Sequence, residues 1–342
     1  MALNKLTTQE SHLASIIEGR AEALLDDLKL HVSIPTGGDN QAALDETRAL
    51  GHLDTVHDPQ GSFRELSIAP DRKIATGPGC VDMKGGLIIA VAALEALEQA
   101  GIDCSWSFLM NSDEETGSYF SDTALATEAA AHDFGLALEP ALAGGELAVE
   151  RMGSGQFAIR CTGRASHVGR AFADGISAVS KLGDCSVAAG QMPDVSRGKI
   201  LNIGPLRGGA ATNAVPDEAW AWGNVRYPTD DVSDELASEL DALVTRAGDL
   251  PGVEVMRSFN RPAKPLTPET ENLALLARAA AEDLGQVLPF AKTGGVCDGN
   301  QLQAAGLPTI DTLGVRGGGL HTPDEWIELR SLVERCQLLA IT

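Results

Sequence analysis

In the first part of this chain, segments with helical spacing of apolar residues alternate with segments that have the spacing of a strand. This alternation limits the folds that the chain can adopt. Residues 8–32 and 82–100 repeat apolar side chains at helical spacing. Residues 105–111 alternate apolar and polar side chains as a strand does, and a short apolar strand at 135–139 is stopped by Pro140. Helices that alternate with strands predict an α/β domain whose mainly parallel sheet is flanked by helices.

A different order of elements begins at about residue 153. The pattern predicts strand, helix, strand, strand, helix and strand at 156–162, 174–189, 199–206, 219–227, 233–247 and 253–259. This order is typical of a ferredoxin-like α+β module. A helix predicted at 269–284 then leads the chain back to the first domain. We therefore predict one domain from residues 1–151 and 263–342, and an inserted α+β domain from 152–262.

Composition narrows the class of protein further. The chain has 342 residues, of which 44% are hydrophobic, so it can form two domains with sizeable cores. Its net charge of −22 argues against nucleic acid or an anionic membrane as a partner, although acidity can also serve solubility alone. The first residues lack the apolar core of a signal peptide, and the longest apolar run is too short to span a bilayer. With six cysteines and no CxxC pair, the pattern predicts a cytoplasmic protein without disulfides or zinc fingers.

His52 and Asp54 stand two residues apart in the segment 51–56. At the end of a strand, residues with this spacing share one face. Asp54 can then orient the imidazole of His52 from behind, as carboxylates commonly do for zinc-bound histidines. Taken alone, such a pair in a loop is more often structural.

Two further segments bring acidic side chains. Asp82 stands at a predicted helix start, where an N-cap aspartate is the simpler interpretation. The glycines of 77–86 approach a dinucleotide-binding loop without completing GxGxxG. Glu114 and Glu115 follow a predicted strand, so one can bind a metal ion while the other, pointing the opposite way, acts as general base. A solvated acidic turn is the alternative for this pair.

Glu139 and His321 complete the set of candidate ligands. Glu139 ends an apolar strand and His321 lies in a glycine-rich loop, both usual positions at the active-site rim of an α/β domain. Two histidines and three carboxylates suit two zinc ions, with one histidine and one glutamate on each ion and an aspartate between them. The same ligands also suit Co²⁺ or Mn²⁺. The chain contains no HExxH, GxSxG, Walker or kinase motif that would indicate another chemistry.

In this order the motifs resemble the co-catalytic zinc exopeptidase and deacylase family. That family includes glutamate carboxypeptidase, acetylornithine deacetylase, succinyl-diaminopimelate desuccinylase and the aminoacylases. The resemblance runs from residue 51 almost to the end, and the loops 296–300 and 317–325 are most similar to the glutamate carboxypeptidase branch. It implies a metal-dependent hydrolase that cleaves an amide bond in a small carboxylate-bearing peptide or N-acyl amino acid.

The resemblance also implies a role for each candidate residue. The metal ligands divide into a pair for each of two divalent ions and one bridge: His52 with Glu139, Glu115 with His321, and Asp82 between the ions. Glu114 is implied as the general base and Asp54 as the orienting carboxylate. A cis peptide bond between Asp82 and Met83 is expected as well.

For the inserted domain, the resemblance implies three functional side chains and a homodimer. His167 would stabilise the oxyanion in the partner subunit's site, and Asn213 would make a similar polar contact. Arg226 would grip the terminal carboxylate of the substrate, a task suited to a planar fork of donors. Without the resemblance, these three would be a surface histidine, a turn asparagine and an exposed strand arginine.

The segment before residue 51 departs from the family pattern. A buried strand that delivers the first histidine should be rich in Val, Ile and Leu, whereas residues 41–50 have helical spacing, as though a block were missing between about residues 50 and 51. An alternative is therefore a catalytically impaired or non-catalytic member of the same fold. A dinucleotide-binding oxidoreductase is a third hypothesis, and it rests only on the glycines of 77–86.

Overall fold

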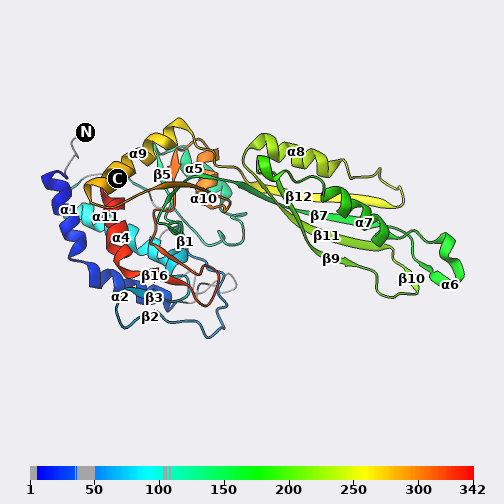
Figure 1. Ribbon diagram of the computed structural model, residues 1–342, viewed down its shortest axis with the longest axis horizontal. Coiled ribbons are helices and arrows are strands. Elements are labelled where there is room, and N and C mark those ends of the chain that lie inside the picture. The colour runs from blue at the N-terminus through cyan, green and yellow to red at the C-terminus, as the bar shows by residue number, and fades with distance from the viewer. Residues whose placement is uncertain (1–5, 35, 37–50, 103–105, 108) are drawn as a thin grey trace. The chain divides into compact units, whose positions relative to one another are not determined.

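The computed structural model describes residues 6–34, 36, 51–102, 106–107 and 109–342 (Figure 1). The chain forms two compact units. The first contains Met1–Glu150, Leu266–Thr293 and Cys297–Thr342, and the second contains Arg151–Pro265 and Gly294–Val296. The helix predicted at 41–50, the break expected before residue 51 and part of the strand predicted at 105–111 lie outside the described residues.

The first unit is organised around α4 (Gly85–Gln99), an apolar helix that is buried on two sides. One side packs with α9, and the other packs with α1, α2 and α11. The remaining helices of this unit are α1 (Thr8–Glu18), α2 (Ala21–Val32), α5 (Asp122–Ala129), α9 (Pro268–Asp283), α10 (Asp298–Ala304) and α11 (Leu329–Ile341). Figure 1 shows α11 in red beside α4 in cyan, with α1 in blue against α11. No helix within the described ranges is long and apolar enough to cross a membrane.

The helix predicted at 8–32 is two helices in the structure. Thr7 caps α1 in a capping box with Glu10, and the helix ends at Glu18 with Gly19, a residue of low helix propensity, as its C-cap. Arg20 then turns the chain and forms an ion pair with Glu95 of α4. Both short helices pack on the same core cluster, and apolar spacing alone does not reveal the break between them.

Strands of the first unit are short and belong to several small sheets. Two parallel pairs are formed by β1 (Gly51–His52) with β4 (Met110–Asn111) and by β5 (Gly135–Leu136) with β14 (Thr309–Ile310). Next to these, β6 (Leu147–Arg151) pairs with β13 (Phe290–Thr293). An antiparallel sheet has the order β15 (Gly317–Gly318), β16 (Trp326–Glu328), β3 (Ile74–Thr76) and β2 (Ser67–Ile68). The predicted mixture of helices and strands is confirmed, and the pairs β1–β4 and β5–β14 are each two residues long.

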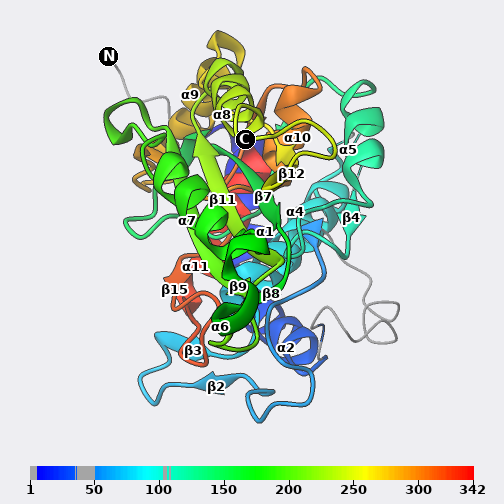
Figure 2. The same cartoon turned by 90° about the vertical axis from the view of Figure 1, so that its right-hand side faces the viewer.

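The second unit contains one antiparallel sheet with the order β12 (Gly252–Arg261), β7 (Gly153–Thr162), β11 (Glu218–Tyr227) and β9 (Ile200–Gly208). Helices α7 (Ala178–Ala189) and α8 (Asp230–Asp241) cover one face, as Figures 1 and 2 show. Phe157, Ile159 and Cys161 alternate along β7 and point into the core beneath these helices. The smaller elements are β8 (Ser166–His167), α6 (Val168–Ala171), η2 (Phe172–Asp174), η3 (Val195–Arg197) and β10 (Ala214–Val215).

Candidate metal centre

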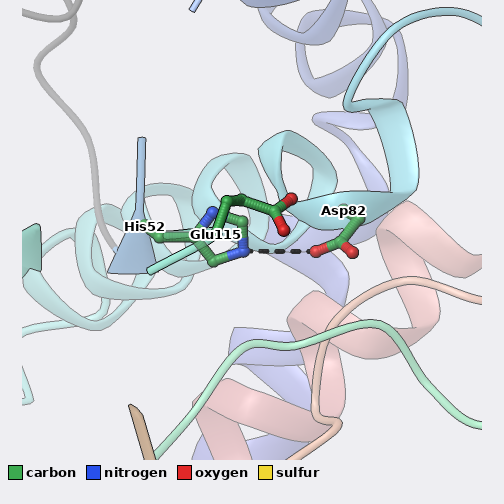
Figure 3. A group of neighbouring side chains, drawn as sticks. All are labelled: His52, Asp82 and Glu115. Atoms are coloured by element: carbon green, nitrogen blue, oxygen red, sulfur yellow. Dashed lines mark hydrogen bonds and ion pairs between the residues drawn. The ribbon is translucent and has the colours of Figure 1, made fainter. Parts of the chain in front are cut away.

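His52 is fixed by β1, which pairs in parallel with β4. Its imidazole is buried, and Nε2 lies 3.2 Å from Asp82 Oδ1 (Figure 3). The same nitrogen lies 4.0 Å from Glu139 Oε1. On the other edge of the ring, Nδ1 lies 2.8 Å from the main-chain oxygen of Asp54. With Nδ1 donating to that oxygen, the lone pair of Nε2 faces the acidic cluster, as a metal ligand requires.

Asp82 lies in the turn η1 (Cys80–Lys84), directly before α4. The helix predicted from residue 82 therefore begins at Gly85, and Asp82 itself has non-helical backbone angles. The expected cis peptide bond between Asp82 and Met83 is present. One carboxylate oxygen faces His52, and the other lies 3.4 Å from His321 Nε2. Burial alone would raise the pKa of Asp82, but hydrogen bonds to His321 and His52 outweigh it and lower the pKa.

Glu115 lies next to His321. Its Oε2 lies 3.4 Å from His321 Nε2, whereas its Oε1 is buried and has no hydrogen-bond partner among the described residues. Burial raises the pKa of Glu115 to about 7. His321 has a φ of 63°, a left-handed conformation that is uncommon for residues other than glycine. The hydrogen bond to Asp82 raises the pKa of His321.

Asp54 is fully buried and does more than orient an imidazole. Its Oδ1 lies 3.7 Å from His52 Nδ1, while its two carboxylate oxygens accept the main-chain N–H groups of Glu114 at 3.3 Å and Glu115 at 3.0 Å. The direct partner of the imidazole is therefore the main-chain oxygen of Asp54. Its carboxylate holds the loop that carries both glutamates, a connection that the spacing of His52 and Asp54 does not predict.

These side chains form a site whose chemistry suits divalent metal ions. One potential ligand atom from each of His52, Asp82 and Glu115 lies within 4.8 Å of the other two. Glu139 and His321 flank this group through their contacts with His52 and Asp82. The unpartnered oxygen of Glu115 and the carboxylate shared by two histidines fit ions bound by nitrogen and oxygen donors.

A polar network that sequence reasoning missed holds the loop after β4. Asp298 accepts hydrogen bonds from Asn111 Nδ2 at 2.8 Å and from Ser118 Oγ at 2.6 Å. Ser118 is buried and has a φ of 51°. Asp298 stands in the first turn of α10, a common place for aspartate, so its sequence context does not indicate a link over 180 residues.

The three residues predicted to contact substrate all belong to the second unit. His167 is exposed in β8, and the pairing of β8 with β10 brings it beside Asn213, whose main-chain oxygen accepts Val168 N–H at 3.0 Å. Arg226 lies on β11 and is half-buried, and its buried Nη1 has no hydrogen-bond partner in the part of the chain that the structure describes. Burial lowers the pKa of Arg226. An arginine with an unpaired N–H group can accommodate a carboxylate.

Known proteins are similar to this chain in sequence and in structure. A family model described as peptidase family M20/M25/M40 matches residues 49–342. Carboxypeptidase G2 of Pseudomonas sp. (strain RS-16) is 28% identical over 298 residues, which cover 85% of this chain and 71% of that protein. Succinyl-diaminopimelate desuccinylase of Psychrobacter arcticus is 26% identical over 310 residues, covering 84% of this chain and 75% of the relative.

Solved structures show the same fold at low sequence identity. A tripeptidase from Staphylococcus aureus has a TM-score of 0.76 and 21% identity, and the match covers 94% of this chain and 97% of that one. An M20 family metallo-carboxypeptidase from Sulfolobus solfataricus has a TM-score of 0.69 and 12% identity, with 93% and 98% of the two chains covered. These likenesses confirm the fold.

Proposed function

The chain belongs to peptidase family M20/M25/M40, and from this premise we propose that it binds two metal ions and cleaves an amide bond next to a carboxylate of its substrate. Membership of this family makes the protein a metal-dependent hydrolase. The observation that carries the two-metal proposal is the position of Asp82, whose two carboxylate oxygens face His52 and His321 separately. A carboxylate placed in this way suits a bridge between two ions.

The proposed ligands form one group for each ion, with a shared bridge: His52 with Glu139, Glu115 with His321, and Asp82 between them. Zn²⁺ is the preferred ion because it favours nitrogen and oxygen donors at low coordination number, and Co²⁺ and Mn²⁺ are the alternatives. When bound, such ions polarise a carbonyl group and lower the pKa of water. Support comes from the buried Oε1 of Glu115, which accepts no hydrogen bond from the described residues and could bind a cation.

Glu114 is proposed as the general base. Its main-chain N–H is held by Asp54, next to that of Glu115, so the two neighbouring side chains can serve different partners. Glu114 would take a proton from the attacking water and deliver it to the leaving amine nitrogen. In the proposed homodimer, His167 of one subunit would donate a hydrogen bond to the developing oxyanion in the partner subunit's site.

The proposed substrate is a small peptide or N-acyl amino acid with a free carboxylate. Arg226 would bind that carboxylate through its guanidinium, and Asn213 would contribute a further polar contact. The relatives named carboxypeptidase and desuccinylase both take their names from reactions on carboxylate-bearing molecules. We further propose a cytoplasmic homodimer that forms through the second unit, which would act as a lid and dimerisation domain.

A substrate screen tests this function directly. Purified protein with added Zn²⁺ would be incubated with dipeptides, N-acetyl and N-succinyl amino acids and N-acyl glutamates, each beside an analogue whose carboxylate is amidated. We expect metal-dependent release of amine from one class of free carboxylates and little release from its amidated analogue. Turnover that persists in excess chelator, or equal turnover of the amidated series, would contradict the proposal.

Glu114→Gln is the matched control for this screen. The amide keeps the size of the side chain but cannot accept the proton, so turnover should fall by about 10²–10⁴-fold. Its metal content should equal that of the unchanged protein, because Glu114 is not a proposed ligand. A variant that lost its metal along with its activity would show that Glu114 has been given the wrong role.

A further inference from the structure

Glu325 lies four residues after His321, in the loop before β16, and only 1% of its surface is exposed. Its Oε1 accepts the main-chain N–H groups of Val81 at 2.9 Å and Asp82 at 3.0 Å. Its Oε2 accepts Gly79 N–H at 2.8 Å and lies 2.5 Å from His57 Nε2. These four contacts fill the accepting capacity of an ionised carboxylate.

The turn that Glu325 binds is shaped to receive an anion. Gly79 has a φ of 67°, and N–H groups close together in such a turn converge on one point. A side chain at Gly79 would bring its Cβ to 2.7 Å from Thr55 Cγ2, so this tight path excludes larger residues. The main-chain oxygen of Glu325 also accepts Gly77 N–H at 3.1 Å, so one residue holds the turn at both ends.

Three segments that carry candidate metal ligands meet at this one carboxylate. Through His57 it reaches the loop that follows His52, and through three amides it holds the turn of Asp82. It belongs to the same loop as His321. All of these side-chain contacts are made by the two carboxylate oxygens of Glu325.

We propose that Glu325 is a positioning residue for the metal centre and sets the place of Asp82 between His52 and His321. This inference rests on the proposed function, because it assumes that Asp82 binds metal ions. The bond to Asp82 N–H fixes the backbone from which the bridging carboxylate extends. Metal-ligand distances tolerate errors of only about 0.2 Å, so a backbone shift in this turn weakens both sites together.

Glu325→Gln tests the proposal while keeping the size of the side chain. The amide nitrogen cannot accept hydrogen bonds, so part of the contact with Gly79, His57, Val81 and Asp82 is lost. Glu328→Gln is the matched control, since Glu328 lies three residues further along and forms an ion pair with Arg316 at 2.7 Å. Both variants would be prepared as full-length protein and stripped of metal.

Zn²⁺ affinity would be measured by competition with a chromophoric chelator, at a temperature where circular dichroism shows each protein to be folded. We expect Glu325→Gln to weaken Zn²⁺ binding by about 10–100-fold and Glu328→Gln to leave it unchanged. The visible spectrum of the Co²⁺ form, which reports ligand geometry, should change in Glu325→Gln alone. A role in folding alone would lower the unfolding temperature without moving the Zn²⁺ affinity or the Co²⁺ spectrum.

If Glu325→Gln does not fold, Glu325→Asp tests the positioning role instead. It keeps the charge but shortens the reach by one methylene, so we expect weaker Zn²⁺ binding than in the unchanged protein. Unchanged affinity and an unchanged Co²⁺ spectrum in whichever variant folds would overturn the role of Glu325. If the unchanged protein itself binds no metal ion, the proposed function fails instead, and the two failures are distinguishable.

Discussion

Asp54 accepts the main-chain N–H groups of Glu114 and Glu115, while its own main-chain oxygen lies against His52 Nδ1. This fully buried residue therefore connects a proposed ligand of one ion, a proposed ligand of the other, and the proposed base. Burial raises the pKa of Asp54, and the contacts with His52 and with the N–H groups of Glu114 and Glu115 oppose that rise. At the scale of residues, the centre depends as much on main-chain contacts as on the ligands themselves.

Asp54→Asn should show this dependence. The amide nitrogen cannot accept an N–H group, so one main-chain donor of the Glu114–Glu115 loop is left unsatisfied, at a cost of about 1–3 kcal/mol in stability. Metal affinity should fall about 10–100-fold. Urea unfolding of the metal-free protein and Zn²⁺ titration measure the two effects. Wild-type values for both would contradict the proposed role.

The pH dependence of metal binding follows from the raised pKa values in the centre. Burial raises the pKa of Glu115 to about 7, and the contact with Asp82 raises the pKa of His321. Both groups therefore hold protons in the metal-free protein at mildly acidic pH, and a metal ion must displace them.

We thus expect Zn²⁺ affinity to rise as pH increases from 5.5 to about 8, by up to about tenfold per pH unit for each proton released. Competition titrations in several buffers would measure the slope, and calorimetry would count the protons released. An affinity that stays constant through this range would show that neither group titrates on binding.

At the scale of elements, the start of α4 passes very close to the segment after β5 that carries Glu139. A Cβ added at Gly86 would lie 2.2 Å from the main-chain oxygen of Leu138. By contrast, a Cβ added at Gly183 in α7 would meet no atom of the described residues within 4 Å. The two glycines are both helical, so they separate the effect of close packing from that of helix propensity.

Gly86→Ala should therefore destabilise the protein by roughly 1–3 kcal/mol, because the added methyl group forces α4 and the Glu139 segment apart. Gly183→Ala should be neutral or stabilise by about 0.5–1 kcal/mol. Urea unfolding compares them directly. Equal effects of the two substitutions would mean that the approach at Gly86 has no energetic consequence.

Sequence patterns located most elements of the second unit, because its strands have one buried face and alternate clearly. The strand predicted at 219–227 is β11 (Glu218–Tyr227), and the helix predicted from 174 begins only at Ala178, since the side chain of Ser177 accepts Ser180 N–H as an N-cap. In the first unit, Asp82 was predicted to start a helix. Its turn is instead held by Glu325, 243 residues away, and no local pattern reveals such a contact.

The sequence predicted which residues belong to the candidate site. It did not predict the hydrogen bonds that hold those residues in place. His52, Asp82 and Glu115 were found from short motifs and do lie together. The networks around Asp54, Asp298 and Glu325 depend on buried main-chain groups, whose partners are fixed only when distant segments pack. The roles of His167, Asn213 and Arg226 remain predictions from family resemblance.

At the scale of the whole molecule, the proposed ligands come from five separate segments of the first unit, between residues 52 and 321. Metal ions would therefore join segments that meet only in the folded chain. Because ions bind the folded state, free metal at a hundred times its Kd should add about 2.7 kcal/mol to stability.

Hydrogen exchange with and without chelator tests this coupling. Metal removal should lower the protection of amides in β1, η1 and the loop 317–325, whereas β7 and β11 of the second unit should keep theirs. The second unit contains none of the proposed ligands and serves as the internal control. A uniform loss of protection across both units would show that the metal ions do not act on the first unit selectively.

The metal content of freshly purified, unchelated protein tests the central claim most directly. We predict about two metal ions per chain for the unchanged protein, and loss of metal from Asp82→Ala, because that substitution removes the carboxylate placed between His52 and His321. Glu114→Gln should retain both ions. An unchanged protein that binds none, or an Asp82→Ala variant that keeps both, would contradict the assignment of this centre.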